Sequence, residues 1–214
     1  MRLYSYWRSS SAYRVRIALN LKGLDYELVP VHLLRDGGEQ LQADHLERNP
    51  QGMVPVLEHG ARSFTQSLAI IEYLEEVSPE PPLLPAVPEE RARVRALAYL
   101  IADDIQPINN LRVLKYLKHE LGVDDAARND WYVHWTLTGL AAFEKLLTSN
   151  APSGKFCHGA SPGLADVCLV PQVYNAERYR CDLAPYPKIR RITQHCRALE
   201  AFSRAAPENQ LDAE

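Results

Sequence analysis

The chain has 214 residues, of which 46% are hydrophobic and 24% are charged, so it can form one large domain or two smaller ones with a substantial core. Its net charge of -3 provides no general attraction to nucleic acid or to an anionic membrane surface. No hydrophobic run reaches the roughly 18 residues of a membrane helix, and the N-terminus lacks the hydrophobic stretch of a signal peptide. We therefore expect a cytoplasmic protein with no nucleic-acid or membrane partner.

The cysteines and histidines form no recognisable metal-binding pattern. The four cysteines lie in the last third of the chain without C-x-x-C or zinc-finger spacing: Cys157, Cys168, Cys181 and Cys196. The seven histidines show no pairwise ligand spacing. Because disulfides rarely persist in the cytoplasm, we expect reduced thiols and no bound metal.

Strand and helix patterns alternate over residues 1–78. Aromatic and β-branched runs predict strands, and amphipathic periodicity predicts helices. The expected elements are strands at 3–7, 26–31, 56–59 and 63–65, and helices at 11–22, 41–48 and from 67 onwards. The order β-α-β-α-β-β-α predicts an α/β thioredoxin-like domain, which is a mixed sheet covered by helices.

The first strand leads into three serines, Ser9, Ser10 and Ser11, which follow Arg8. The next helix begins there, and the free backbone N–H groups of a helix N-terminus form a natural anion site. The simplest alternative is that Ser10 or Ser11 only caps the helix, because serine is a preferred N-cap residue. A cap accounts for one serine, so the three together indicate a bound anion such as a thiolate.

Residues 79–88 hold five of the fifteen prolines and therefore predict a stiff linker. Beyond them, hydrophobic residues repeat at steps of three and four, which predicts an all-α domain over residues 89–214. The expected helices cover 89–121, 124–147, 164–179 and 187–202. We expect Pro107 to kink the first of them, because it removes a main-chain hydrogen bond, and residues 207–214 to fray.

Short motifs follow one another from residue 4 to about residue 202. They are Ser9-Ser10-x-x-x-Arg14-Val15-Arg16-Ile17-Ala18-Leu19, Asn49-Pro50-x-x-x-Val54-Pro55, Gln66-Ser67-Leu68-Ala69-Ile70-Ile71-Glu72-Tyr73-Leu74, Pro79-x-Pro81-x-Leu83-Leu84-Pro85, Ile105-Gln106-Pro107-x-x-Asn110-Leu111, Ala165-Asp166-x-Cys168-Leu169-Val170-Pro171-Gln172 and Asn175-Ala176-Glu177-Arg178-Tyr179. Each motif is weak by itself. In this order and spacing, the set resembles glutathione transferases, and the zeta class most closely.

The resemblance implies a thioredoxin-like domain that holds glutathione, an all-α domain that adds a wall for the second substrate, and a homodimer with glutathione near its interface. Zeta-class members include maleylacetoacetate and maleylpyruvate isomerases of aromatic catabolism. These enzymes convert a cis maleyl diketo-acid, a small dicarboxylate, into its trans isomer by thiolate addition, bond rotation and elimination. The sequence does not distinguish the two substrates, which differ mainly in one acyl end.

The resemblance also implies where glutathione is held. Ser9, with Ser10 and Ser11 beside it, is expected to bond the sulfur. The backbone of Val54, before a proline expected to be cis, is expected to pair with the cysteinyl part. The other implied contacts are Gln66 and Ser67 for the γ-glutamyl carboxylate, Gln40, and, from this chain or from the partner subunit, Gln106 and Asn110.

Two positions depart from the pattern of the zeta class. Ser11 stands where cysteine is frequent, so no cysteine chemistry is expected there. Gly163 stands where Ser or Thr usually caps the helix that contains Asp166, which weakens the capping box but leaves an acceptable N-cap.

A serine hydroxyl at this turn is strong enough to stabilise a thiolate. Lowering a thiol pKa by ~2 units from about 8.5 requires roughly 2.7 kcal/mol. A helix N-terminus contributes about 0.3–1 kcal/mol, and a hydroxyl bonded to the anion roughly 1.5–3 kcal/mol. We expect Ser9 to be that donor rather than a plain turn residue. A hydrolase nucleophile is disfavoured further, because no G-x-S-x-G elbow surrounds Ser9.

Arginines are the candidate ligands for the substrate carboxylates, because guanidinium binds carboxylate through two hydrogen bonds. We expect Arg8, beside the serines, to take this role. Arg112 and Arg178 lie in the helical half, where a solvated surface arginine is an equally good interpretation. Arg14 and Arg16 are expected to be structural.

Two other functions are compatible with these motifs. A broad glutathione transferase or a glutathione-dependent dehalogenase would share the same glutathione contacts. A non-catalytic interaction module is disfavoured, because it would not require the full set of contacts.

Overall fold

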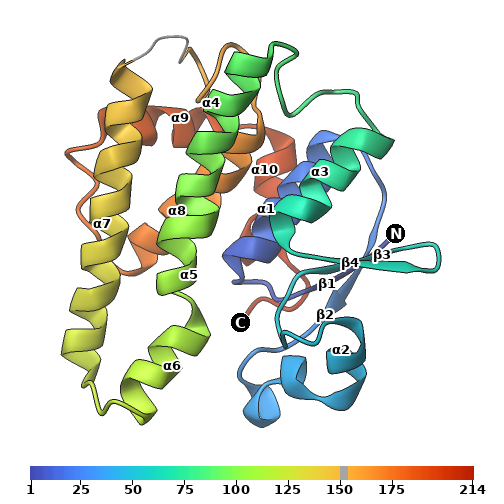
Figure 1. Ribbon diagram of the computed structural model, residues 1–214, viewed down its shortest axis with the longest axis vertical. Coiled ribbons are helices and arrows are strands. Elements are labelled where there is room, and N and C mark those ends of the chain that lie inside the picture. The colour runs from blue at the N-terminus through green and yellow to red at the C-terminus, as the bar shows by residue number, and fades with distance from the viewer. Residues whose placement is uncertain (150–153) are drawn as a thin grey trace. The chain divides into compact units, whose positions relative to one another are not determined.

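The computed structural model describes residues 1–149 and 154–214, which Figure 1 shows coloured along the chain. They fall into an N-terminal unit, Met1–Leu83 with Ala198–Glu214, and a helical unit, Leu84–Arg197. The sequence predicts a division into residues 1–78, a linker at 79–88 and a helical domain at 89–214. The structure differs at the C-terminus, where the last residues pack with the N-terminal part.

A four-stranded mixed sheet with the order β2-β1-β3-β4 forms the centre of the N-terminal unit. Its strands are β1 (Arg2–Ser5), β2 (Glu27–Pro30), β3 (Val56–His59) and β4 (Arg62–Thr65). Strand β2 runs parallel to β1, which requires a crossover connection, whereas β3 and β4 form an antiparallel hairpin beside β1. Pro30 ends an edge strand, where its missing N–H is tolerated. The predicted thioredoxin-like fold is confirmed.

Helices cover both faces of this sheet. Helices α1 (Ser10–Leu21) and α3 (Ser67–Val77) pack against each other, and Figure 1 shows them on the face opposite α2 (Ala43–Arg48). Two short 3-10 turns, η1 (Arg35–Gly37) and η2 (Glu39–Leu41), precede α2. The crossover helix α1 ends before Gly23, whose φ of 63° lies in the left-handed region that favours glycine.

The core of the N-terminal unit combines one face of the sheet with the inner faces of α1 and α3. Leu3, Ile17, Leu57 and Ile70 are completely buried there. Burying each of these side chains stabilises the unit by roughly 1.5–3 kcal/mol. This packing fixes the position of α1, and with it the turn that precedes the helix.

The C-terminal segment belongs to the same unit. The helix expected at 187–202 is interrupted, because α9 (Pro187–Arg197) ends before α10 (Glu200–Ala205), and α10 packs on α1. Beyond it, η4 (Pro207–Asn209) and the last residues are hydrogen-bonded to the unit, so the expected fraying is wrong. The local sequence shows no sign of this order, because the bond from Trp7 N to Asp212 joins residues that are far apart in the chain.

The helical unit contains no strand within its described residues. Its elements are α4 (Pro88–Tyr99), η3 (Leu100–Ile105, a π-helical segment), α5 (Gln106–Ile108), α6 (Leu111–His119), α7 (Asp125–Ser149), α8 (Leu164–Arg178) and α9. The predicted all-α second part is confirmed.

The helix expected at 89–121 is divided near Pro107. The α-helical pattern of α4 passes into the wider turns of η3, and Pro107 follows in the short α5. A π-helical segment is uncommon and frequently lies at functional sites. A new helix then starts at Asn110, which caps α6 by accepting a hydrogen bond from Arg112 N at 3.1 Å.

The start of α8 is held by a buried carboxylate. Asp166 accepts hydrogen bonds from Gly163 N at 3.0 Å and from Cys157 N at 2.9 Å. The Asp half of the capping box is therefore present although Gly163 has no side chain. The structural role expected for Asp166 is confirmed.

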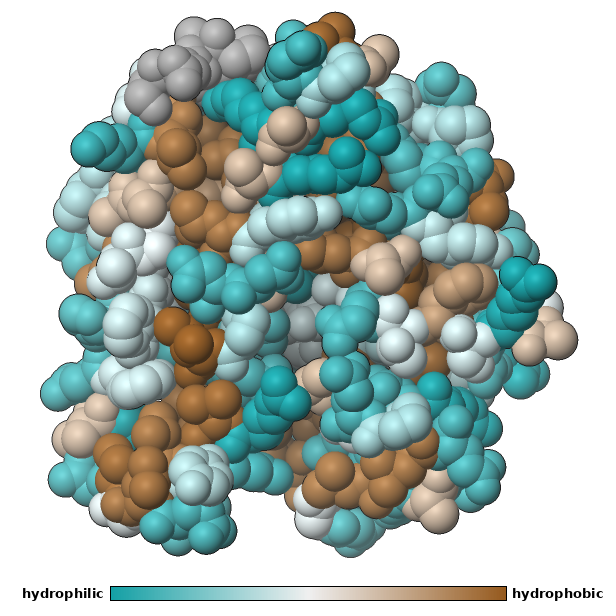
Figure 2. Space-filling model, viewed as in Figure 1, coloured by the Kyte–Doolittle hydropathy of each residue, from teal (hydrophilic) through white to brown (hydrophobic). Residues whose placement is uncertain are grey.

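Figure 2 shows a largely polar face with some hydrophobic clusters, one of them over the η1–α2 part of the chain. Three leucines are exposed there, Leu34, Leu41 and Leu46. Among the helices of residues 1–149 and 154–214, none is both long enough and apolar enough to cross a membrane.

Candidate functional site

The turn between β1 and α1 presents a serine hydroxyl at a helix N-terminus. Ser9 is the N-cap of α1, and its Oγ accepts a hydrogen bond from Ala12 N at 3.3 Å. The cap is therefore Ser9 and not Ser10 or Ser11, which form the first helical positions. Three consecutive serines have the same capping preference, so the local sequence could not select among them.

Capping leaves the Ser9 hydroxyl able to donate. A hydroxyl has one hydrogen and two acceptor lone pairs, and the bond to Ala12 uses a lone pair. The hydrogen remains to bond an anion in front of α1, where the helix dipole also favours negative charge. The turn thus offers a bound anion both a hydroxyl donor and the positive end of the helix dipole.

Arg16 has the structural role that was expected of it: it holds this turn in place, although the sequence did not indicate which groups it bonds. Its side chain is completely buried, and it donates to Trp7 O at 2.9 Å, Tyr6 O at 3.4 Å and Ser5 Oγ at 2.9 Å. The same guanidinium donates to Ala205 O at 3.0 Å in α10. A buried arginine on a helix face is the signal that could have indicated this role, since charge is costly inside a protein unless it is well bonded.

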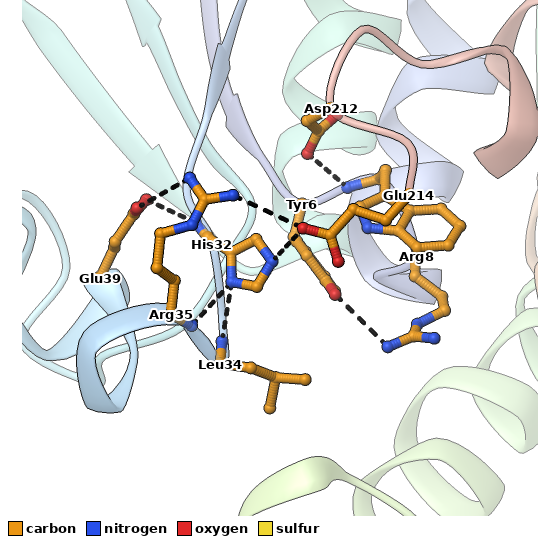
Figure 3. A network of polar contacts seen from close by, with 9 residues as sticks. Tyr6, Arg8, His32, Leu34, Arg35, Glu39, Asp212 and Glu214 are labelled. Carbon is orange, nitrogen blue, oxygen red and sulfur yellow. Dashed lines mark hydrogen bonds and ion pairs between the residues drawn. The ribbon is translucent and has the colours of Figure 1, made fainter.

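Arg8 lies against aromatic side chains at the same turn. Its guanidinium carbon is 4.9 Å from the ring centre of Trp7, and its Nη2 donates to the Tyr6 hydroxyl at 3.4 Å (Figure 3). Aromatic contact limits the positions open to a long side chain. The guanidinium is therefore held near the serines with donors to spare, since it has five N–H groups.

Two further predicted contacts, Val54 and Gln40, lie in the same unit as this turn. The peptide bond between Val54 and Pro55 is cis, as expected, and Val54 belongs to the same buried cluster as Tyr6 and Trp7. Gln40 is buried, and its Oε1 has no hydrogen-bond partner in residues 1–149 and 154–214. A buried acceptor without a donor is costly, so this oxygen fits a ligand that brings an N–H group.

The N-terminus of α3 has the features of a second anion site. Ser67 is the first residue of α3, and its Oγ accepts a hydrogen bond at 3.1 Å from Nη1 of the buried Arg14. A buried cation beneath a helix N-terminus favours a carboxylate at that position. Arg14, expected to be purely structural, therefore also adds charge to this site.

Gln66 precedes that helix in a strained conformation. Its φ is 66° and its ψ is 112°, and its Nε2 donates to Gln51 Oε1 at 2.7 Å. A residue other than glycine held in such a region costs about 1–3 kcal/mol and is found mostly at functional sites. Such a conformation at the residue that precedes α3 supports a functional role for Gln66.

The remaining candidate residues lie in the helical unit: Gln106 in α5, Asn110 at the cap of α6, Arg112 in α6 and Arg178 at the end of α8. The side chain of Arg112 is exposed, and the guanidinium carbon of Arg178 is 4.9 Å from the ring centre of Tyr179. Burial raises the pKa of the neighbouring Tyr132, and the charge of Arg178 opposes this effect. The functional roles of the four residues stay predictions.

Comparisons with known proteins identify the family of the chain. The family model "Glutathione S-transferase, N-terminal domain" matches residues 3–82. A probable maleylacetoacetate isomerase of Vibrio cholerae is 54% identical over 99% of this chain and 97% of its own length.

Two solved structures are similar along their whole length, each covering 100% of both chains. The holo structure of a maleylpyruvate isomerase, a bacterial zeta-class glutathione transferase, has a TM-score of 0.97 at 48% identity. A maleylacetoacetate isomerase from Methylobacterium extorquens AM1, with bound malonate and GSH, has a TM-score of 0.96 at 41% identity.

Proposed function

Because the chain belongs to the zeta class of the glutathione transferase family, we propose that it isomerises a maleyl diketo-acid with glutathione, and that the Ser9 turn carries the reaction. The observation that supports this role most directly is the hydroxyl of Ser9 at the N-terminus of α1, bonded to Ala12 in a way that leaves its hydrogen free to donate. The full-length relatives described above are isomerases, which favours this reaction over broad conjugation or dehalogenation.

Residues of the N-terminal unit fit glutathione. Ser67 and the buried Arg14 suit the γ-glutamyl carboxylate together with Gln66, the backbone beside the cis Pro55 suits the cysteinyl part, and Gln40 offers an unpaired acceptor. When bound, glutathione supplies a thiolate that adds reversibly to the substrate double bond and so permits rotation. Gln106 and Asn110 are proposed as further contacts on family resemblance alone.

Ser9 stabilises the thiolate by donating its hydroxyl hydrogen, and Ser10 and Ser11 keep the start of α1 polar beside it. Arg8 holds a carboxylate of the diacid and stabilises the negative charge that develops on the substrate during addition. The malonate bound to the relative from Methylobacterium extorquens AM1 is likewise a dicarboxylate. Arg112 and Arg178 are proposed as additional carboxylate ligands on family resemblance alone.

An isomerisation assay tests the proposed function. We expect the chain to convert maleylpyruvate or maleylacetoacetate to its trans isomer only when glutathione is added, and the ratio of the two kcat/KM values identifies the preferred substrate. Chlorodinitrobenzene conjugation, measured in parallel, should be much slower. Rapid conjugation without isomerisation would instead support a broad transferase.

Substitutions at Ser9 test the role of the hydroxyl. We expect Ser9→Ala to raise the thiol pKa of bound glutathione by about 1–2 units, because a hydroxyl bonded to an anion contributes roughly 1.5–3 kcal/mol. Ser9→Thr keeps a hydroxyl that can both cap and donate, so it should remain close to the unmodified chain. Ser63→Ala, at an exposed position of β4, serves as the control. An unchanged thiol pKa in Ser9→Ala would remove Ser9 from the mechanism.

We propose that the chain works as a homodimer in the cytoplasm. The four cysteines are free and buried, which is compatible with a reducing compartment. Analytical ultracentrifugation should give about twice the chain mass of 24.2 kDa, and cell fractionation should recover the protein with the cytosol. A monomeric mass with full activity would contradict a requirement for the dimer.

A further inference from the structure

The last residues of the chain reach the turn that bears Arg8 and Ser9. Figure 3 shows Asp212 beside the backbone nitrogen that precedes Arg8, and Glu214 beside His32. The Oδ2 atom of Asp212 accepts a hydrogen bond from Trp7 N at 2.9 Å. The chain therefore returns, within its last three residues, to the end of its first strand.

Both polar groups of the Trp7 backbone are bonded to charged side chains. Its carbonyl oxygen accepts from Arg16 at 2.9 Å, and its N–H donates to Asp212. Trp7 is thus fixed from two sides, by α1 and by the C-terminal segment, immediately before Arg8 and Ser9.

We propose that Asp212 is a positioning residue, which holds the Trp7–Ser9 turn so that the Ser9 hydroxyl and the Arg8 guanidinium face glutathione and its substrate. This inference rests on the proposed function. A small displacement of a catalytic group, of about 1 Å, can reduce a rate by roughly a hundredfold, so a contact that fixes the turn affects the reaction without touching the substrate.

The carboxylate acts here as a hydrogen-bond acceptor. Only Oδ2 of Asp212 accepts the hydrogen bond from Trp7 N. Its Oδ1 is buried and has no hydrogen-bond partner in the described part of the chain. A negative charge close to a thiolate would by itself raise the thiol pKa. An asparagine, which offers one acceptor oxygen and no charge, should therefore replace Asp212 without loss.

Glu214 contributes much less than Asp212. The Nδ1 atom of His32 accepts hydrogen bonds from Leu34 N and Arg35 N, so Nε2 carries the proton and donates to Glu214 Oε1 at 3.0 Å. Arg35 lies 3.5 Å from the same oxygen, but the Glu214 side chain is 57% exposed. Exposed ion pairs stabilise little, so Glu214 provides a matched control at the same end of the chain.

The test compares Asp212→Ala, Asp212→Asn and Glu214→Gln in the full chain. Thiolate absorbance as a function of pH gives the thiol pKa of bound glutathione, and steady-state kinetics with maleylpyruvate give kcat and KM. We expect Asp212→Ala to raise the thiol pKa by about one unit and to lower kcat about tenfold, with a smaller change in KM. Asp212→Asn and Glu214→Gln should remain within about twofold of the unmodified chain in kcat.

The proposal is overturned if Asp212→Ala leaves the thiol pKa and kcat unchanged, or if Asp212→Asn is as impaired as Asp212→Ala. Deletion of residues 212–214 repeats the test without a substituted side chain and should reproduce the effect of Asp212→Ala. If the unmodified chain binds no glutathione, the proposed function itself fails, and this is seen before any variant is compared.

Discussion

Arg8 illustrates how one side chain can be positioned before the substrate arrives. Its contacts with Trp7 and Tyr6 orient the guanidinium but do not use its full set of donors. We expect Arg8→Met to raise KM for maleylpyruvate about ten- to a hundredfold, because a charged hydrogen bond contributes roughly 1.5–3 kcal/mol. KM for the neutral electrophile chlorodinitrobenzene should change little. Equal effects on both substrates would show that Arg8 does not bind carboxylate.

Gln66 allows strain and ligand binding to be separated. Because its φ is 66°, glycine at this position should be more stable than alanine by about 1–3 kcal/mol. We therefore expect Gln66→Gly to melt at a higher temperature than Gln66→Ala. Both variants should bind glutathione more weakly, since both lose the side-chain amide. Equal melting temperatures would mean that the conformation of Gln66 is not strained.

At the scale of the elements, the start of α8 depends on Asp166. The buried carboxylate bonds Gly163 N and Cys157 N, so Asp166→Ala leaves both donors without a partner. We expect this change to lower the free energy of unfolding by about 2–4 kcal/mol, measured by urea denaturation. Asp182→Ala is the control, because Asp182 makes a similar bond to Ala184 N on the surface. Similar losses in both variants would contradict a special role for the buried carboxylate.

The order of strands and helices could be predicted because each element has its own local pattern. The βαβ and ββα halves follow from runs of β-branched residues, helical periodicity and turn residues, and the sheet of the structure has the expected topology. Helix breaks were harder to predict. Pro107 marks one position within 89–121, but the π-helical turns before it leave no signal in the periodicity of hydrophobic residues.

The candidate site was predictable where it depends on local motifs and family resemblance, as at Ser9, Val54 and Gln66. The contacts that support it were not, because Arg16 and Asp212 act through bonds to the backbone of Trp7. A backbone group has the same chemistry at every position, so no residue pattern indicates such a bond. Only the folded chain brings these partners together.

At the scale of the whole molecule, the cysteines offer a test of how firmly the helical unit is packed, because all four lie in it. Cys157, Cys181 and Cys196 have a raised thiol pKa because they are buried, and Cys168 is buried with them. The thiolate is the reactive form of cysteine. We therefore expect a thiol reagent to react slowly with the native protein, and to label all four cysteines once the protein is denatured. A thiol that reacts rapidly in the native protein would show that the helical unit opens.

The division of the N-terminal unit between Met1–Leu83 and Ala198–Glu214 has a consequence for synthesis on the ribosome. Helix α1 emerges early, but α10, which packs on it and accepts a bond from Arg16 at Ala205, is translated after the whole helical unit. Domains that are continuous in sequence fold one after another as the chain emerges. Here the helical unit can fold before residues Ala198–Glu214, which the N-terminal unit needs, have been synthesised. The unit that bears Ser9 can therefore be completed only after the helical unit has been translated.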